Sequence, residues 1–496
     1  MNQTPPRLSA AKLTFFLLLA FILAAGAFLR LTDLAQPLLD FHPTRQLFSA
    51  VKARGMYYQT LPNAPAWQKD ISYRQWQGEA TIEPPIVENI AVFFYHLTGE
   101  ENTACPRAVS ASFWMIAAVF VLLLAQNLTH SPPAAAFSTA FFLLIPYAVS
   151  ASRAFQPDPL MVLWMVIFWW AIETWGRKNS WRWAILAGLT GGLAIFVKLP
   201  AAFFVVGGGL GAILAHSSLI SALRNAKTWL IAILCILPPA AYLYYGLSVA
   251  GFLGQQFGGR FFPADWIDPY FYLRWLLKVD TVIGLFWLAL AGVGWLVFSV
   301  KPAKTFLAAL WGAYFVYGLA FPHHIASHDY YSLPLIPLAA LSLAPLIVAF
   351  FPRLWSATKA RFAHLAIVLS SLFFLFSYTT VTYLDLRQAD TRLAAQTYAE
   401  IGEILQHQPG ILALTENYGY PLAYYGWQNV NLWSGGDNIE QAFKQQTFEK
   451  AYFVITDFDE LARQPELVQK LAGYQIFAQT RAYIIYDLKT PLPLIR

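Results

Sequence analysis

Long apolar stretches separated by short polar connections dominate the chain up to residue 384. A helix needs about 20 mostly apolar residues to cross the hydrocarbon core of a bilayer, and about eleven stretches approach this length. They lie near residues 12–31, 107–127, 133–151, 159–176, 182–197, 199–215, 228–249, 281–300, 305–321, 330–351 and 362–383. The pattern predicts an all-α polytopic membrane domain over residues 1–384.

The loop of residues 32–106 interrupts this pattern and contains weaker helical signals. Pro43 suits the first turn of a helix, and Gly55 suits its C-terminal end. Residues 86–97 have apolar positions at helical spacing but are short and include Glu88 and His96. We therefore expect interfacial helices in this loop instead of a further span.

The positions of Lys and Arg predict the orientation of the chain. If residues 86–97 lie flat and the N-terminus is cytoplasmic, the later basic connections all face the cytoplasm, as the positive-inside rule requires. These connections lie at residues 177–182, 224–227, 301–304 and 353–361. The sequence thus predicts a multi-pass protein of the inner cell membrane, with residues 32–106, 152–159, 250–280 and 321–329 on the extracytoplasmic face.

The composition changes after residue 384. A helical pattern covers residues 391–406, and short apolar runs follow at 411–414, 452–455 and 482–486, separated by helix-like stretches at 438–443 and 460–470. Alternating helix and strand signals at this spacing are typical of an α/β domain. We expect residues 385–496 to form an extracytoplasmic α/β domain.

The overall composition agrees with a membrane protein. The chain is 57% hydrophobic and 12% charged, whereas soluble proteins carry about 25% charged residues. The net charge of +6 reflects basic connections between spans, so it does not indicate a nucleic-acid partner. Cys105 and Cys235 provide neither a disulfide framework nor a CxxC metal pair.

Two acidic residues lie at predicted outer ends of spans. Asp40 precedes the helix that starts at Pro43, where a carboxylate either stabilises the helix dipole or acts as a general base at the membrane surface. Asp158 precedes Pro159, which suits an N-cap. An ionisable group this close to the bilayer is also a candidate functional residue, and both interpretations of Asp158 can hold together.

Cations and aromatic residues accompany these acids on the predicted outer face. Lys198 and Arg260 either extend towards the interface or bind a lipid phosphate, for which the arginine fork is well suited. His323, His324, His328 and Asp329 suggest zinc, but their spacing matches no established ligand set, so a divalent metal stays open. Tyr330 and Tyr331 fit an aromatic belt.

Several short motifs in order resemble the GT-C superfamily of polyprenyl-phosphate-sugar glycosyltransferases. The similarity covers most of residues 10–350 and is strongest to protein O-mannosyltransferases and lipid A aminoarabinose transferases. The matches are Arg-x-x-Asp-Leu at 30–34, Asp40, Glu-Pro-Pro-Ile at 83–86, Pro-Asp-Pro-Leu at 157–160, Gly-Leu-Ala at 192–194 with Lys198, and His-Asp-Tyr-Tyr at 328–331 with Pro334 and Pro337. No single match is specific for the superfamily. Six matches in the right order and on the same membrane face are together a strong indication of it.

The resemblance implies transfer of a sugar, with inversion, from a polyprenyl phosphate to an acceptor hydroxyl of a protein, lipid or glycan. Asp40 would be the base and Asp158 would assist. The remaining site residues are Arg45, Lys198 and Arg260 for the donor phosphate, and His42, Glu83, His328, Tyr330 and Tyr331 for substrate binding. No resident cofactor is implied apart from the divalent metal left open above.

Two departures from the family pattern concern the donor. Asp40 is followed by Phe41 and His42, where relatives often have Glu, and Ile82-Glu83 stands where aminoarabinose transferases have Glu-Lys. The lysine expected to hold phosphate is therefore absent, and the identity of the sugar stays open.

Two other classes of function fit parts of the sequence. A transporter or lipid flippase needs charged or broken helices near the middle of the bilayer, and the glycines at 191–192 and 207–209 are the main signal in its favour. A structural protein that presents its C-terminal domain would leave the outer charges of the membrane domain without a role.

Overall fold

The computed structural model describes residues 10–254, 262–357 and 361–492. The contacts divide the chain into two compact units. The helical unit comprises residues 1–34, 81–86 and 107–388, and the mixed unit comprises residues 35–80, 87–106 and 389–496. Most of the loop 32–106, predicted from the sequence to belong to the membrane domain, therefore packs with the C-terminal segment.

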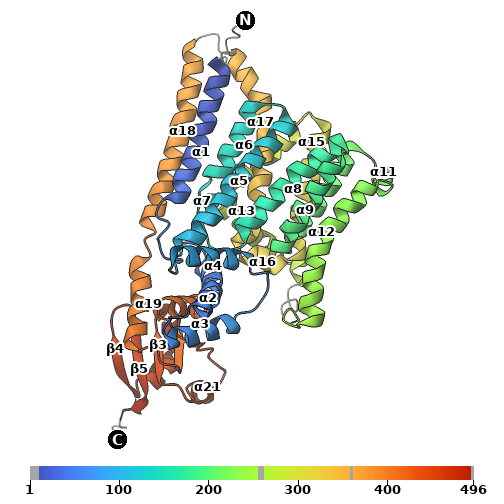
Figure 1. Cartoon of the computed structure of the whole chain (residues 1–496). Coiled ribbons are helices and arrows are strands. Elements are labelled where there is room, and N and C mark those ends of the chain that lie inside the picture. Colours follow the sequence, from blue (N-terminus) through green and yellow to red (C-terminus); the bar gives the residue numbers. More distant parts are fainter. Residues whose placement is uncertain (1–9, 255–261, 358–360, 493–496) are drawn as a thin grey trace. The chain divides into compact units, whose positions relative to one another are not determined.

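The helical unit is a bundle of mostly long helices (Figure 1). Its helices are α1 (Ala10–Leu31), α5 (Ala104–Thr129), α6 (Pro132–Leu144), α7 (Pro146–Ser152), α8 (Asp158–Lys178), α9 (Trp181–Val197), α10 (Ala201–His216), α11 (Leu219–Leu223), α12 (Ala226–Tyr244), α13 (Pro269–Ile283), α14 (Leu285–Val297), α15 (Lys301–Ala320), α16 (Pro322–Ser327), α17 (Leu335–Ala357) and α18 (Arg361–Gln388). A π-helical turn, η1 (Tyr245–Val249), extends α12, and short 3₁₀ turns occur at η2 (Pro263–Ile267) and η3 (Asp329–Ser332).

Each stretch predicted as a span coincides with a helix or with a bent pair of helices. By length and hydropathy alone, three helices of the described chain can cross a membrane, and up to five spans result if each bent pair counts as one. The three are α5, α8 and α12 with its π-helical extension. Helices α9 and α10 and the described apolar parts of α1 and α17 are shorter, so the figure of about eleven spans stays a prediction.

Two expected spans are broken by identifiable residues. Helices α6 and α7 meet at an angle of 63°, where Pro146 lacks the N–H that would continue the helix. The Leu143 carbonyl near this bend accepts a hydrogen bond from Nη1 of Arg30 at 2.8 Å. Helices α13 and α14 meet at 90° at Gly284, whose φ of 81° suits glycine. The expected span 281–300 is therefore the shorter helix α14.

Glycines allow helices of the bundle to approach closely. A Cβ on Gly192 would lie 2.3 Å from the carbonyl oxygen of Leu234, and one on Gly207 would lie 2.4 Å from the Cβ of Ala313. These positions are in the contacts of α9 with α12 and of α10 with α15. Gly192 and Gly207, two of the glycines that favoured a transporter, thus have a packing role.

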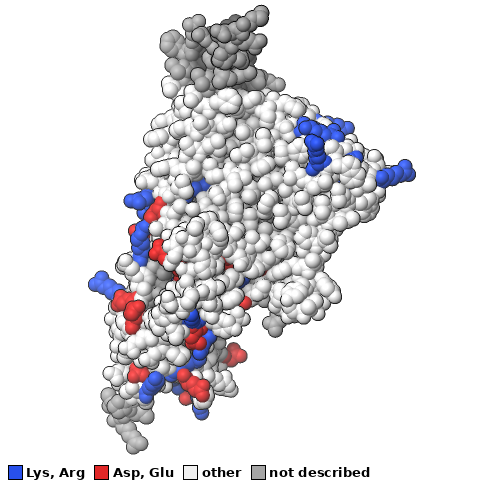
Figure 2. Space-filling view, viewed as in Figure 1, with Lys and Arg blue, Asp and Glu red and all other residues white. Residues whose placement is uncertain are grey.

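Charged side chains are unevenly distributed on the helical unit. Figure 2 shows few of them on the broad middle of its visible face, while Lys and Arg gather near α11. A surface that faces lipid is expected to expose apolar side chains and few charges, and the scarcity of charged side chains here agrees with that expectation.

The mixed unit contains both helices and a sheet (Figure 1). Its elements are α2 (Pro43–Thr60), α3 (Ala66–Gly78), α4 (Ile86–Thr98), α19 (Arg392–Ile404), β1 (Ile411–Leu414), η4 (Asn417–Gly419), α20 (Tyr420–Tyr425), β2 (Val430–Leu432), α21 (Ile439–Gln446), β3 (Tyr452–Ile455), α22 (Phe458–Ala462), α23 (Pro465–Leu471), β4 (Tyr474–Gln479) and β5 (Ile484–Pro491). The strand order is β2-β1-β3-β5-β4. Strand β1 pairs in parallel with β2 and β3, whereas β5 is antiparallel to β3 and β4.

Helices cover both faces of this sheet. Alternate residues of the strands point to opposite faces, so Leu412 and Phe453 pack with α21 and α23, while Ile411 and Val454 pack with α19 and α20. The sheet and its two helical layers give the C-terminal segment an α/β architecture of its own.

Helix α2 is longer than the sequence indicates. It continues past Gly55 to Thr60, because Gly55 is a contact point instead of a helix end. A Cβ there would lie 2.3 Å from the Cβ of Trp76 on α3. The glycine therefore lets α2 and α3 pack together.

Candidate active site

A buried ion pair joins the beginning of α8 to the end of α9. Nζ of Lys198 donates a hydrogen bond to Oδ1 of Asp158 at 2.8 Å, and the two residues are 6% and 1% exposed. Asp158 is the first residue of α8. Its Oδ1 accepts a hydrogen bond from the ammonium of Lys198, so capping of the helix does not by itself explain why an acidic residue stands at this position. A buried pair of this kind is costly to desolvate and calls for an explanation.

Aromatic rings from η3 flank the same ammonium. Nζ of Lys198 lies 5.2 Å from the ring centre of Tyr330 and 5.5 Å from that of Tyr331, which is within cation–π range. The His328 ring lies 5.5 Å from Tyr330 and 6.1 Å from Tyr331. The structure therefore brings together five of the expected residues, with Asp158 and Lys198 at the centre.

Buried polar atoms beside the pair have no hydrogen-bond partner in the described chain. They are Oδ2 of Asp158 and both side-chain amide atoms of Gln156, a residue that is 0% exposed. Leaving such a group unsatisfied costs about 1–3 kcal/mol. Because native proteins rarely bear this cost without reason, these atoms are candidates for binding a polar ligand. Gln156 is not among the site residues predicted from the sequence, although it stands two residues before Asp158.

Hydrogen bonds fix the turn that carries the aromatic residues. The hydroxyl of Tyr147 on α7 donates to Oδ1 of Asp329 at 2.8 Å, and Ser327 Oγ lies 2.7 Å from Nδ1 of His328. The described residues include no group of three or more His, Cys, Asp or Glu side chains arranged to hold a metal ion. Among the described residues, the histidine-rich loop thus has no cluster of three such ligands, and the divalent metal stays an open expectation.

Two further expected residues are placed differently. Glu83 belongs to the helical unit, in the segment 81–86 that precedes most of α4. Arg260 lies outside the described residues.

Asp40, His42 and Arg45 belong to the mixed unit. Nε2 of Gln46 donates to Oδ1 of Asp40 at 3.1 Å and to the carbonyl of Phe41 at 2.6 Å. His42 is the N-cap of α2 with a left-handed φ of 43°, and Arg45 lies in the first turn of the helix. Asp40 is therefore held by the beginning of α2, as the sequence indicates. The expected site residues thus form two groups, one in each unit.

Buried and half-buried ionisable groups lie beside α2 beyond its first turn. Ser49 Oγ donates to Oε1 of Glu88 at 2.9 Å, and Nζ of Lys52 lies 3.9 Å from the same oxygen. The hydroxyl of Tyr420 donates to Oε2 of Glu79 at 2.7 Å. Burial raises the pKa of the Glu79 carboxyl, although the hydrogen bond from Tyr420 and the charge of Lys52 act against this shift.

Comparison with known proteins extends this description. Residues 82–245, which include Asp158 and Lys198, match the sequence model of the dolichyl-phosphate-mannose-protein mannosyltransferase family. No curated protein sequence matches the chain.

Solved structures with the same fold cover nearly the whole chain. The apo form of ArnT from Cupriavidus metallidurans is 14% identical, with a TM-score of 0.65 over 96% of this chain and 98% of that one. ArnT bound to undecaprenyl phosphate is 15% identical, with a TM-score of 0.62 over the same shares. The oligosaccharyltransferase AglB from Archaeoglobus fulgidus, in complex with an inhibitory peptide and a dolichol-phosphate, is 11% identical, with a TM-score of 0.55 over 98% and 76%.

These comparisons do not favour the transporter and confirm the resemblance seen in the sequence motifs. The family match lies on the segment that carries the buried ion pair, and the fold is that of membrane glycosyltransferases. Residues 82–245 are thus similar to the dolichyl-phosphate-mannose-protein mannosyltransferase family, and the chain has the fold of ArnT and AglB.

Proposed function

We propose that the chain transfers a single sugar, with inversion, from a polyprenyl monophosphate to an acceptor hydroxyl at the extracytoplasmic face of the inner membrane. The donor class follows the names of the family and of the ArnT complex. The acceptor is a hydroxyl of a protein, a lipid or a glycan. The basic connections between the helices support this orientation.

The buried pair of Asp158 and Lys198 is the observation that carries the proposal. An ammonium has three donors, and Asp158 accepts one of them. Lys198 thus has donors available for the phosphate of the donor, whose negative charge grows as the sugar leaves. The rings of Tyr330 and Tyr331 keep the ammonium poorly hydrated, which strengthens its attraction to phosphate. The amide of Gln156 suits a sugar hydroxyl.

Asp40 has the role of general base in this proposal. The acceptor oxygen bonds to the anomeric carbon while the bond from that carbon to the phosphate oxygen breaks. The acceptor proton moves to the Asp40 carboxylate, and polyprenyl phosphate leaves with the bonding electron pair. Attack on the side opposite the leaving group inverts the anomeric centre.

A direct test uses purified protein in nanodiscs and a panel of radiolabelled polyprenyl-phosphate sugars. Wild type should bind one donor saturably and consume it, by transfer to an added acceptor or by slow hydrolysis. The Asp40→Asn variant should bind the same donor and lose transfer, because its amide cannot accept the proton. Asp70→Asn is the matched control, since Asp70 forms an exposed pair with Arg74 on α3.

The outcomes separate the parts of the proposal. Failure of wild type to bind any polyprenyl phosphate would overturn the assigned donor class. Full transfer by Asp40→Asn would remove Asp40 from the mechanism while leaving the donor class intact. Loss of transfer in Asp70→Asn as well would mean that the loop tolerates no carboxylate replacement, and the result for Asp40 would then reflect folding.

A further inference from the structure

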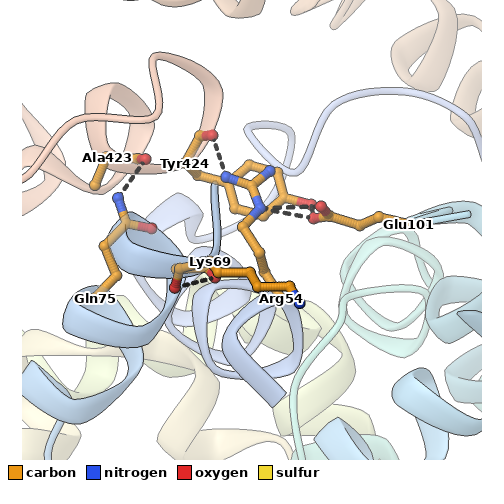
Figure 3. Close-up of polar contacts among 7 residues, drawn as sticks. Arg54, Lys69, Gln75, Glu101, Ala423 and Tyr424 are labelled. Carbon is orange, nitrogen blue, oxygen red and sulfur yellow. Dashed lines mark hydrogen bonds and ion pairs between the residues drawn. The ribbon is translucent and has the colours of Figure 1, made fainter. Parts of the chain in front are cut away.

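The short helix α20 of the C-terminal segment is fixed to α2 through a buried arginine. Nε of Arg54, on α2, donates to Oε1 and Oε2 of Glu101 at 3.1 and 3.0 Å. Its Nη1 donates to the carbonyl of Tyr424, and its Cζ lies 3.7 Å from the centre of the Tyr424 ring. Figure 3 shows the guanidinium between Glu101 and Tyr424. The Tyr424 hydroxyl donates in turn to Glu101.

Other residues of α20 contact further parts of the same loop. Nε2 of Gln75 on α3 donates to the carbonyl of Ala423 at 2.8 Å (Figure 3). Tyr420 donates to Glu79 at 2.7 Å, and its ring meets Phe48 of α2 edge-on at 6.4 Å between centres. With contacts to α2, α3 and the residue at position 101, α20 has little freedom to move against the loop.

The last residue of α20 reaches the backbone that carries Asp40. The Tyr425 hydroxyl accepts a hydrogen bond from the backbone N–H of Leu38 at 2.7 Å, two residues before Asp40. Leu38 is 0% exposed, so this N–H relies on the tyrosine for its partner instead of on water. On the other side of Asp40, Gln46 holds the carboxylate and the Phe41 carbonyl. Asp40 therefore lies between an anchor from α2 and an anchor from α20.

We propose that Tyr425 is a positioning residue for the transfer reaction, through which the C-terminal segment fixes the backbone next to Asp40. The inference rests on the role proposed above for Asp40. A general base must lie within hydrogen-bond reach of the proton that it removes, and a misplacement of about 1 Å can lower a rate by about a hundredfold. Arg54 and Glu101 hold α20 rigidly against the loop. The hydroxyl of Tyr425 extends this constraint to the backbone next to Asp40.

The test removes only the hydroxyl of Tyr425. We expect Tyr425→Phe to lower kcat by about tenfold to a hundredfold, with the KM for the donor unchanged because the donor phosphate is bound elsewhere. kcat is counted per saturable donor-binding site, so misfolded protein does not enter the ratio. Tyr483→Phe is the matched control. The Tyr483 hydroxyl donates to Glu400 at 2.7 Å in the same segment, and its loss should leave kcat unchanged.

A second measurement does not depend on activity. Hydrogen–deuterium exchange of peptides that cover residues 36–46 should become at least tenfold faster in Tyr425→Phe than in wild type, because the Leu38 amide loses its partner. Tyr483→Phe should show wild-type exchange in these peptides. The comparison is informative even if the assigned donors fail.

The results distinguish the two proposals. An inactive wild type that binds no donor overturns the proposed function, whereas the exchange data still decide whether Tyr425 holds the segment. An active wild type with full kcat per site in Tyr425→Phe overturns the positioning role alone. A loss of donor-binding sites in proportion to activity would likewise overturn it, because Tyr425 would then act only on folding.

Discussion

The ion pair of Asp158 and Lys198 has a structural cost, which its proposed role in binding the donor phosphate would explain. Two charges buried at 1% and 6% exposure gain little stability compared with an apolar pair, but removing one partner leaves the other uncompensated. The unpartnered oxygen of Asp158 and the amide of Gln156 add to this cost. Such an arrangement is expected where binding of a charged substrate determines which residues are kept.

Replacing Lys198 separates these two contributions. Lys198→Met should lower the free energy of unfolding by about 3–5 kcal/mol, because the Asp158 carboxylate stays buried without its cation. The double variant Asp158→Asn with Lys198→Met should recover most of that loss while transfer stays abolished. Thermal denaturation and donor turnover measured on the same preparations test this. Recovery of turnover together with stability would show that the pair serves the fold alone.

The Glu79 carboxyl should make stability depend on pH. Because its pKa is raised above the ordinary value of 4.5, the folded state holds the proton more tightly than the unfolded state. The free energy of unfolding should therefore fall as the pH rises through the interval above 4.5. Glu79→Gln should be more stable than wild type at pH 7 and should lose this advantage towards pH 5.

Thermal midpoints measured between pH 5 and pH 8 check the sign of this effect. Glu466→Gln, at an exposed position of α23, is the control and should follow wild type over the whole range. An advantage of Glu79→Gln that grows as the pH falls would contradict the raised pKa.

At the scale of elements, apolar stretches and turn residues predicted most helices, and non-local contacts decided what the pattern left open. Positions 411–414 and 452–455 were recognised as strands because they are continuously apolar and central in the sheet. The pattern does not predict strands β2 and β4, because they are edge strands with mostly exposed side chains. Gly55 suggested a helix end, since no local pattern reveals that Trp76 packs against it.

The contact of α9 with α12 should tolerate no additional atom at Gly192. Gly192→Ala would place a Cβ against the Leu234 carbonyl and should lower the free energy of unfolding by about 1–3 kcal/mol. Gly209→Ala, where nothing lies within 4 Å, should be neutral or stabilising by up to about 1 kcal/mol. Thermal denaturation of both variants in one detergent makes the comparison. Equal midpoints would mean that α9 and α12 separate at little cost.

For the whole molecule, the sequence motifs were sufficient for the resemblance to a superfamily and for Asp158 and Lys198 as single candidates, but not for their pairing or for the organisation into units. Asp158, Lys198, Tyr330 and Tyr331 were found because short motifs carry them. Tyr425 and Arg54 were not found, because their importance arises from contacts between residues hundreds of positions apart. The only sequence feature that points to Gln156 is its closeness to Asp158, and this is a weak indication of a site residue.

The proposed orientation predicts a difference in labelling between two serine positions. In a chain with Cys105 and Cys235 replaced by serine, Ser434→Cys in the C-terminal segment should react with a membrane-impermeant thiol reagent in intact spheroplasts. Ser221→Cys, on α11 beside the basic connection 224–227, should react only after the membrane is permeabilised. Both serines are exposed, so accessibility within the protein does not bias the comparison. The reverse pattern would invert the topology.

The discontinuity of the mixed unit has a consequence for the synthesis of the protein. The partners of Arg54 and Leu38 at residues 424 and 425 are translated more than 300 residues after the loop that needs them. At about 5–20 residues per second, this early loop waits on the order of tens of seconds with Arg54 lacking its Tyr424 partner and the backbone before Asp40 unsupported. During that interval the nascent loop is exposed to chaperones and proteases, and a ribosome that stops late leaves a nearly full-length chain in which the backbone next to Asp40, the proposed base, was never fixed.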